Sequence, residues 1–329
     1  MPKVTTKNGA MFECQTGQSI IDAGLEAGVV LEHSCRSGRC DTCKAIVLTG
    51  ETELTQAEQI SSLGIDRKAE ILMCCRTAKT DIVLDVEGLT NFELFLPSVL
   101  PCKIESMELL TEDVMEIKFR FPPSANLAFN PGQYIDLKAP SGVVRSYSIA
   151  NQSNDDALVL QVKNYREGVM SNYLFNDAKI NTLMSIRGPL GTFHLRRRKA
   201  KHLVFLATGT GIAPILSMLA LGNVKSPAQT VSVYWGVRRY SDLYVSAEDL
   251  VSVDHFRPVL SRENHAGYER GYVQDLLVRD FDSFQDVEVY ACGSSQMIAA
   301  AFDLLTTNGL SPESFFSDAF VESHREVQA

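Results

Sequence analysis

The 329-residue chain lacks the features that would place it in a membrane, in the secreted class or on a nucleic acid. Its first residues, MPKVTTKNGA, show no basic-then-apolar secretory pattern. The longest uncharged run, residues 203–224, has glycines and a proline in its middle, so it predicts a strand, a loop and a helix instead of a membrane span. With 40 acidic against 31 basic residues, nucleic acid is excluded as the main partner. We expect a cytoplasmic protein.

Hydrolytic chemistry is also without support. The chain has six histidines, and no Ser-His-Asp arrangement or metal-hydrolase motif accompanies them, so no histidine is assigned a catalytic role. There are no internal repeats. Hydrophobic residues make up 45% of the chain, which gives ample material for packed cores, and the length suits two or three domains.

Eight cysteines are present, and a disulfide framework does not explain them in a chain of this size without a secretory signal. Cys35, Cys40 and Cys43 have the spacing Cys-x4-Cys-x2-Cys, followed by the adjacent pair Cys74 and Cys75. This is the plant-type spacing for a 2Fe-2S cluster. Zinc is less well supported, because zinc sites usually combine two well-separated Cys pairs. By spacing alone, either Cys74 or Cys75 could be the fourth ligand.

The loop from residue 34 to 43 is small and polar, which suits backbone N–H groups that turn inward toward sulfur. Residues 1–90 resemble the plant-type ferredoxin domain, which implies a β-grasp-like fold. The apolar lead Ile71-Leu72-Met73 resembles the family's approach to its last ligand, and this implies Cys74 as the fourth. Asp41 departs from the small residue that is more usual after the second ligand.

The order of elements predicts three domains, at residues 1–90, 101–199 and 200–329. The first shows a short helix capped by Ser19 and ended by Gly28, with strands at 44–48 and 81–86. The second alternates strands and turns with one helix at 169–175, as in a small antiparallel β-barrel. The third alternates strands and helices, which indicates a doubly wound parallel sheet. The fold class is therefore multidomain, α+β and α/β.

The middle segment carries a pattern suited to a flavin. Arg145 and Tyr147 lie two residues apart on one strand face, so the guanidinium can pair with a pyrophosphate while the ring lies along a flat heterocycle. Ser148 can offer a hydroxyl to that heterocycle. A second phosphate cradle is predicted at Gly168-Val169-Met170-Ser171, where glycine frees the backbone and serine can cap a helix.

The last segment carries a pattern suited to a dinucleotide. The strand 203–207 runs into a glycine-containing loop before a helix, which lets phosphate approach the backbone at the positive helix end. Pro214 replaces the third glycine of the usual fingerprint. The predicted contact residues of this loop are Thr208, Gly209, Thr210, Gly211 and Pro214.

Together these motifs resemble the ferredoxin-NADP reductase family. The resemblance implies that Arg145, Tyr147, Ser148, Gly168, Met170 and Ser171 hold FAD. It also implies that the turn Cys292-Gly293 lies near the nicotinamide, and that Phe320 is the terminal aromatic that covers the flavin until nicotinamide displaces it. Cys292, Phe320, Tyr147 and Ser148 are thus the predicted residues closest to the chemistry. Arg238, Arg239 and Arg262 could favour a 2'-phosphate, whereas the resemblance favours NADH.

NAD(P)H gives up two electrons as hydride and a 2Fe-2S cluster accepts one, so a flavin between them joins the two steps. The whole chain resembles the CDP-6-deoxy-3,4-glucoseen reductase family. The resemblance implies electron transfer from NADH through FAD and 2Fe-2S to a PMP-dependent sugar dehydrase in 3,6-dideoxyhexose synthesis. One alternative is the reductase component of a ring-hydroxylating or multicomponent oxygenase, and a third is a non-catalytic redox sensor.

Overall fold

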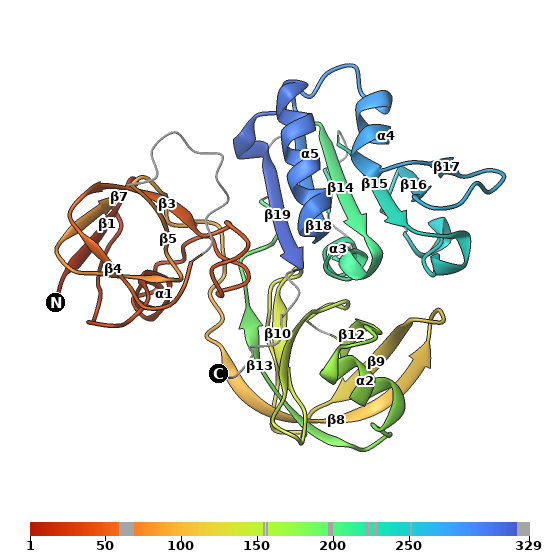
Figure 1. Ribbon diagram of the computed structural model, residues 1–329, viewed down its shortest axis with the longest axis horizontal. Helices are drawn as coiled ribbons and strands as arrows, with labels where there is room; N and C mark the ends of the chain where they lie inside the picture. Colours follow the sequence, from red (N-terminus) through yellow and green to blue (C-terminus); the bar gives the residue numbers. More distant parts are fainter. Residues whose placement is uncertain are drawn as a thin grey trace. The chain divides into compact units, whose positions relative to one another are not determined.

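The computed structural model describes residues 1–58, 69–153, 155, 157–196, 200–221, 224–226, 229–250 and 252–320. The chain divides into two compact units, one formed by Met1–Leu96 with Asp318–Ala329 and the other by Pro97–Ser317 (Figure 1). Across the described residues, no helix is both long and apolar enough to cross a membrane.

The N-terminal unit is built on a mixed sheet of order β2-β1-β7-β3-β5, with β4 and β6 paired separately. β1 runs antiparallel to β2 and parallel to β7, as in a β-grasp fold, which confirms the predicted class. Ser19 caps α1 by accepting from the Asp22 N–H at 3.1 Å, and the helix buries Ile20 and Ile21. The elements are β1 (Lys3–Thr6), β2 (Met11–Glu13), α1 (Ile20–Glu26), β3 (Lys44–Thr49), β4 (Thr52–Leu54), β5 (Glu70–Leu72), β6 (Arg76–Ala78) and β7 (Ile82–Leu84).

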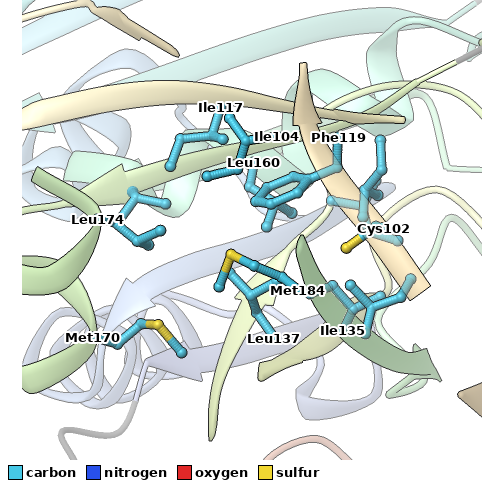
Figure 2. Close-up of a cluster of buried hydrophobic side chains, with 14 of the residues drawn as sticks. Cys102, Ile104, Ile117, Phe119, Ile135, Leu137, Leu160, Met170, Leu174 and Met184 are labelled. Carbon is cyan, nitrogen blue, oxygen red and sulfur yellow. The ribbon is translucent and has the colours of Figure 1, made fainter. Parts of the chain in front are cut away.

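The second unit begins with an antiparallel sheet of order β11-β10-β13-β8-β9-β12. A bridge between Ile149 and Leu160 joins its two edges, so the sheet nearly closes into the predicted barrel. Figure 2 shows the barrel core, where side chains from the strands meet Met170 and Leu174 of α2. The elements are β8 (Ser98–Leu109), β9 (Val114–Arg120), β10 (Tyr134–Lys138), β11 (Val144–Ser148), β12 (Leu158–Lys163), α2 (Val169–Asn176) and β13 (Leu183–Leu190).

The same unit continues into a sheet of order β17-β16-β15-β14-β18-β19, whose central strands are parallel. Val204 and Leu206 of β14 pack with helices α4 and α5, which lie over one face (Figure 1). Its elements are β14 (His202–Thr208), η1 (Gly209–Gly211), α3 (Ile212–Leu219), β15 (Thr230–Val237), η2 (Tyr240–Asp242), η3 (Ala247–Asp249), β16 (His255–Leu260), β17 (Glu269–Arg270), α4 (Val273–Asp280), β18 (Val287–Ser294), α5 (Ser295–Thr307), η4 (Pro312–Ser314) and β19 (Phe315–Phe320).

The strand order of this sheet creates a topological switch. From β14 the chain adds β15, β16 and β17 on one side, then returns to place β18 on the other side of β14. In open parallel sheets, ligands bind outside the carboxyl ends of the two strands that flank such a switch. This position lies after Thr208 of β14 and Ser294 of β18.

Polar contacts join the barrel to the parallel sheet inside the second unit. The Ser217 hydroxyl of α3 donates to the Asn151 carbonyl at 2.6 Å. The Tyr290 hydroxyl of β18 accepts from the Arg196 backbone N–H at 2.9 Å. The barrel and the sheet are therefore held together by directional bonds, which fixes the loops of one relative to the strands of the other.

Candidate functional sites

The cysteine loop between α1 and β3 has an unusual backbone. Arg36 and Asp41 adopt positive φ angles of 54° and 57°, and Gly38 has φ 73°. Asp is among the few side chains that tolerate this region, which explains how Asp41 fits where a smaller residue is more usual. The left-handed residues turn N–H groups inward: the Ser37 N–H points at Cys35 Sγ and the Cys35 N–H at Cys40 Sγ, both at 3.4 Å.

The thiols of this region form two pairs. A hydrogen bond from Cys40 lowers the pKa of Cys35 to about 5, and the same contact raises the pKa of Cys40. A hydrogen bond from Cys43 lowers the pKa of Cys74 to about 7. Among the described residues, no three His, Cys, Asp or Glu side chains converge on a single ion. Two pairs of thiols match the donor set of a two-iron cluster, in which each iron takes two thiolates.

Cys75 lies in a different environment from Cys74. Its side chain is fully buried, with Sγ 3.5 Å from the Ala57 carbonyl and 3.5 Å from Cys74 Sγ. A β-carbon on Gly38 would lie 2.7 Å from Cys75 Sγ, so this thiol packs under the loop. Cys74 is the thiol that meets Cys43. The arrangement fits a 2Fe-2S cluster held by Cys35, Cys40, Cys43 and Cys74, with Cys75 as a packing residue.

Arg36 of the cysteine loop has a carboxylate partner. Its guanidinium forms an ion pair with Asp22 of α1. Arg36 therefore ties the loop to the helix, and its positive charge is already matched by a carboxylate.

The flavin-type residues of β11 lie as expected from their spacing. β10 and β11 pair so that Ile135 faces Tyr147 and Leu137 faces Arg145. Burial raises the pKa of Tyr147, and the nearby Arg145 charge acts against that rise. Arg145 donates to the Val144 carbonyl at 2.7 Å, and no carboxylate partner is recorded for it in the described part of the chain. A guanidinium without a carboxylate, next to an aromatic ring, fits a phosphate-bearing flavin.

The second cradle is a tight turn before α2. Ser171 Oγ accepts from the Tyr165 N–H at 3.1 Å and lies 3.1 Å from the Gly168 carbonyl. A β-carbon on Gly168 would lie 2.4 Å from Ser171 Oγ, so this position requires glycine. Ser171 thus shapes the turn through its own hydroxyl, and Met170 is buried in the barrel core, so only its backbone is available to a ligand.

The dinucleotide-type loop follows β14 at the switch. Gly209 has φ +53°, and a β-carbon there would meet no atom within 4 Å, so the loop is open on that side. Pro214 stands in the first turn of α3, where its missing N–H costs no helix bond. Open space beside a glycine at a helix start fits a pyrophosphate approaching the backbone.

Cys292 and Gly293, expected to form a turn, lie within the last residues of β18 and close the other side of the switch. A β-carbon on Gly293, which has φ +137°, would lie 2.2 Å from Thr208 Oγ1. The Ser294 N–H donates to the same Thr208 oxygen at 3.2 Å. The structure therefore brings Thr208 and Gly211 together with Cys292 and Gly293, although the two segments are about 80 residues apart. The Cys292 side chain is fully buried. Phe320 is half-buried and ends β19.

Arginines at the ends of the next strands also come together. Arg238 and Arg239 follow β15, Arg262 follows β16, and all three side chains are exposed. The Arg262 N–H donates to the Arg238 carbonyl at 2.9 Å. Both strand ends lie at the carboxyl edge of the sheet, where the ribose end of a dinucleotide binds in this fold class.

Two buried residues support these sites and were assigned no role from the sequence. Gln133 is buried and donates from Nε2 to the Gly191 carbonyl at 2.8 Å, which holds the loop after β13. Trp235 is fully buried and donates from Nε1 to the Gly209 carbonyl at 2.9 Å. The only sequence signal was that Trp235 is the single tryptophan of the chain.

Family models match three successive segments of the chain. The model of the 2Fe-2S iron-sulfur cluster binding domain matches residues 4–79. The oxidoreductase FAD-binding domain matches residues 101–195, and the oxidoreductase NAD-binding domain matches residues 205–303. The chain therefore has the domains for FAD, NAD and a 2Fe-2S cluster.

Curated relatives extend over nearly the whole chain. The protein RfbI of Salmonella typhimurium is 37% identical over 95% of this chain and 94% of its own length. The CDP-6-deoxy-L-threo-D-glycero-4-hexulose-3-dehydrase reductase of Yersinia pestis is 36% identical over 96% of this chain and 97% of its own. The reductase component of the naphthalene 1,2-dioxygenase system of Pseudomonas putida is 27% identical over 95% of this chain and 96% of its own.

A solved structure shows the same fold. The crystal structure of the Amycolatopsis cytochrome P450 reductase GcoB matches with a TM-score of 0.79 and 28% sequence identity. The match covers 98% of this chain and 99% of GcoB. The confirmed architecture is that of an NAD(P)H-dependent oxidoreductase with three redox modules in one polypeptide.

Proposed function

Because the chain belongs to the CDP-6-deoxy-L-threo-D-glycero-4-hexulose-3-dehydrase reductase family, we propose that it supplies electrons to a sugar dehydrase. The proposed route runs from NADH through FAD and a 2Fe-2S cluster to a partner that acts in CDP-3,6-dideoxyhexose synthesis. One observation carries the proposal: two relatives of that name are 36% identical over 96% of the chain, so the similarity includes all three modules.

Each module contributes a separate task. Arg145, Tyr147 and Ser148 on β11 bind and orient the flavin, which supplies the exchange between two-electron and one-electron transfer. The loop after β14 and the C-terminal end of β18, with Cys292 and Gly293, hold the nicotinamide cofactor at the switch. Cys35, Cys40, Cys43 and Cys74 would hold a 2Fe-2S cluster, which would supply single-electron transfer when bound.

The proposed acceptor is a PMP-dependent dehydrase that removes the C3 hydroxyl of a CDP-hexulose, and we place the reaction in the cytoplasm. A second acceptor class has a specific observation in its favour. The naphthalene dioxygenase reductase of Pseudomonas putida covers the same length of chain, but at 27% identity. The dehydrase partner is preferred because identity to the dehydrase reductases is higher over the same residues.

Reconstitution tests this choice. NADH oxidation by the purified protein is followed in air-free buffer, alone and with a PMP-loaded hexulose-3-dehydrase and its CDP-hexulose. A parallel series in aerated buffer, where the oxygenase has its O2, compares the protein alone with the protein plus a ring-hydroxylating oxygenase and its aromatic substrate. We expect NADH consumption to depend on the dehydrase and to match the deoxygenated sugar formed. Consumption that depends only on the oxygenase would replace the dehydrase by the second acceptor class, and absence of NADH-dependent flavin reduction would reject the reductase itself.

A further inference from the structure

The single tryptophan of the chain lies under the dinucleotide loop. Trp235 is on β15, in register with Ala207 near the end of β14, and its side chain is fully buried. Its indole N–H donates to the Gly209 carbonyl at 2.9 Å. The bond therefore reaches from the neighbouring strand to the first residue of the loop.

The Gly209 carbonyl is held from two directions. It also accepts from the Ile212 N–H at the start of α3, so both of its acceptor positions are used. In a trans peptide the carbonyl and the following N–H point in opposite directions. Holding the Gly209 carbonyl toward the helix and Trp235 thus turns the Thr210 N–H outward, away from the helix start.

Gly209 needs such a restraint. Its φ of +53° is one of several conformations that glycine adopts at little cost, and the space around its Cα is open. A peptide free to rotate would spend part of its time with the carbonyl oxygen directed outward. An outward carbonyl repels phosphate oxygens, whereas an outward N–H binds them.

The Trp235 ring is also held by a contact with Tyr244, which is bonded to the flavin-domain barrel. Its ring lies edge-on to Tyr244 with centroids 4.9 Å apart, and the Tyr244 hydroxyl donates to Gln161 Oε1 of β12 at 3.0 Å. Both Tyr244 and Gln161 are largely shielded from solvent, and burial raises the pKa of Tyr244. The indole is therefore braced between the loop and the flavin-domain barrel.

We propose that Trp235 is a positioning residue for the nicotinamide cofactor: its indole N–H fixes the Gly209 peptide so that the Thr210 N–H meets the pyrophosphate. The inference rests on nicotinamide binding by this domain and is independent of which protein accepts the electrons. The Trp235 side chain is fully buried and its one polar atom is bonded to the Gly209 carbonyl, so we expect its effect on affinity instead of on the transfer rate.

The test substitutes Trp235→Phe, which keeps a ring and removes the donor. Loss of one hydrogen bond reduces the fraction of correctly oriented loop, so the dissociation constants of NADH and ADP-ribose should rise about 3- to 10-fold. The rate of flavin reduction at saturating NADH should stay within about twofold. Adenosine lacks the pyrophosphate, so its dissociation constant should be unchanged. Tyr234→Phe removes a different hydrogen bond from the same strand, the one from the Tyr234 hydroxyl to Asp280, and keeps the indole donor, so it serves as the matched control.

A second measurement uses the unaltered protein. With one tryptophan, the ¹⁵N-labelled oxidised protein gives one indole N–H signal, which should shift on saturation with ADP-ribose and stay in place with adenosine. The inference is overturned if Trp235→Phe has the same dissociation constants for NADH and ADP-ribose as the parent protein. It is also overturned if the chemical shift of the indole N–H signal does not change on saturation with ADP-ribose. If the parent protein itself fails to reduce its flavin with NADH, the proposed function fails separately.

Discussion

Gly211 and Cys292 are in direct backbone contact across the switch: a β-carbon on Gly211 would lie 2.3 Å from the Cys292 carbonyl oxygen. Gly209, two residues earlier, has open space at the same position of its Cα. The two glycines of one short loop thus serve different purposes. Gly211 allows two strand ends to approach, whereas Gly209 leaves room for a ligand.

This difference predicts opposite effects of two alanine substitutions. Gly211→Ala should lower thermal stability by several degrees, because backbone atoms of β18 must move apart. Gly209→Ala should cost only about 1 kcal/mol of stability from its left-handed φ, yet weaken NADH binding at least tenfold, because the methyl group occupies the ligand's space. Calorimetry and titration of flavin reduction with NADH measure the two effects. Equal stability losses would contradict the assignment.

The cysteine pairs predict which thiol of the adjacent pair holds iron. Cys74→Ser should abolish the 2Fe-2S absorption and EPR signals, since it removes the partner of Cys43, while NADH still bleaches the flavin. Cys75→Ser should retain the cluster, with at most a modest loss of stability from a polar group in a buried place. Iron and acid-labile sulfide analysis quantifies both. The reverse outcome would make Cys75 the ligand.

The Arg145 guanidinium, which has no carboxylate partner among the described residues, predicts a role in FAD retention. Arg145→Ala should raise the dissociation constant of FAD about 10- to 100-fold through loss of charge-assisted hydrogen bonds to phosphate, and Arg145→Lys should recover only part of it. Flavin content after gel filtration and fluorescence titration of the apoprotein measure this. The exposed Arg120→Ala on β9 is the control and should bind FAD normally. Unchanged flavin content in Arg145→Ala would refute the assignment.

His194 predicts a pH dependence of stability. Its side chain is buried, and burial, together with the Arg196 charge, lowers its pKa from 6.5 to about 4, against the upward pull of the Thr192 carbonyl bond. Between these values the unfolded chain binds more protons than the folded one, so the free energy of unfolding falls as the pH drops from about 6.5 toward 4, by at most about 3 kcal/mol.

His194→Asn keeps a donor for the Thr192 carbonyl and removes the titration, so its unfolding free energy should depend less on pH over that range. Urea unfolding followed by Trp235 fluorescence at several pH values measures the second unit. His255→Asn, at an exposed position, should leave the pH dependence as it is. A parent protein with the same pH profile as His194→Asn would show that His194 is not buried in neutral form.

Local patterns predicted helices more completely than strands. The helix capped by Ser19 is found at Ile20–Glu26, and the helix expected at 169–175 is found at Val169–Asn176. The first follows from its serine cap and apolar spacing, whereas the second has no side-chain cap bond and begins after Gly168. Edge strands β17 and β19 were not predicted, because Glu269–Arg270 and Phe315–Phe320 take their form from neighbouring strands more than from an alternating pattern of their own.

Some features of the candidate sites could be predicted from the sequence, and others depend on tertiary packing. Cysteine spacing and the glycine loop are readable from the sequence because their residues are close together in the chain. The ion pair of Arg36 with Asp22 and the bond from Trp235 to Gly209 depend on tertiary packing, which brings together residues with no shared motif. The choice of Cys74 over Cys75 was implied only by family resemblance, since spacing treats the two alike, and the contact between Cys43 and Cys74 was not predicted.

The pairing of Cys43 with Cys74 has a mechanical consequence. These two residues are 31 positions apart in the sequence, and Cys35 and Cys40 both come before them. Metal bound across both pairs would act as a cross-link that closes this interval, and chain entropy assigns such a closure about 3–4 kcal/mol. Iron bound at this place would therefore help the N-terminal unit to fold as well as carry charge, and oxidative damage to it would loosen the polypeptide around it.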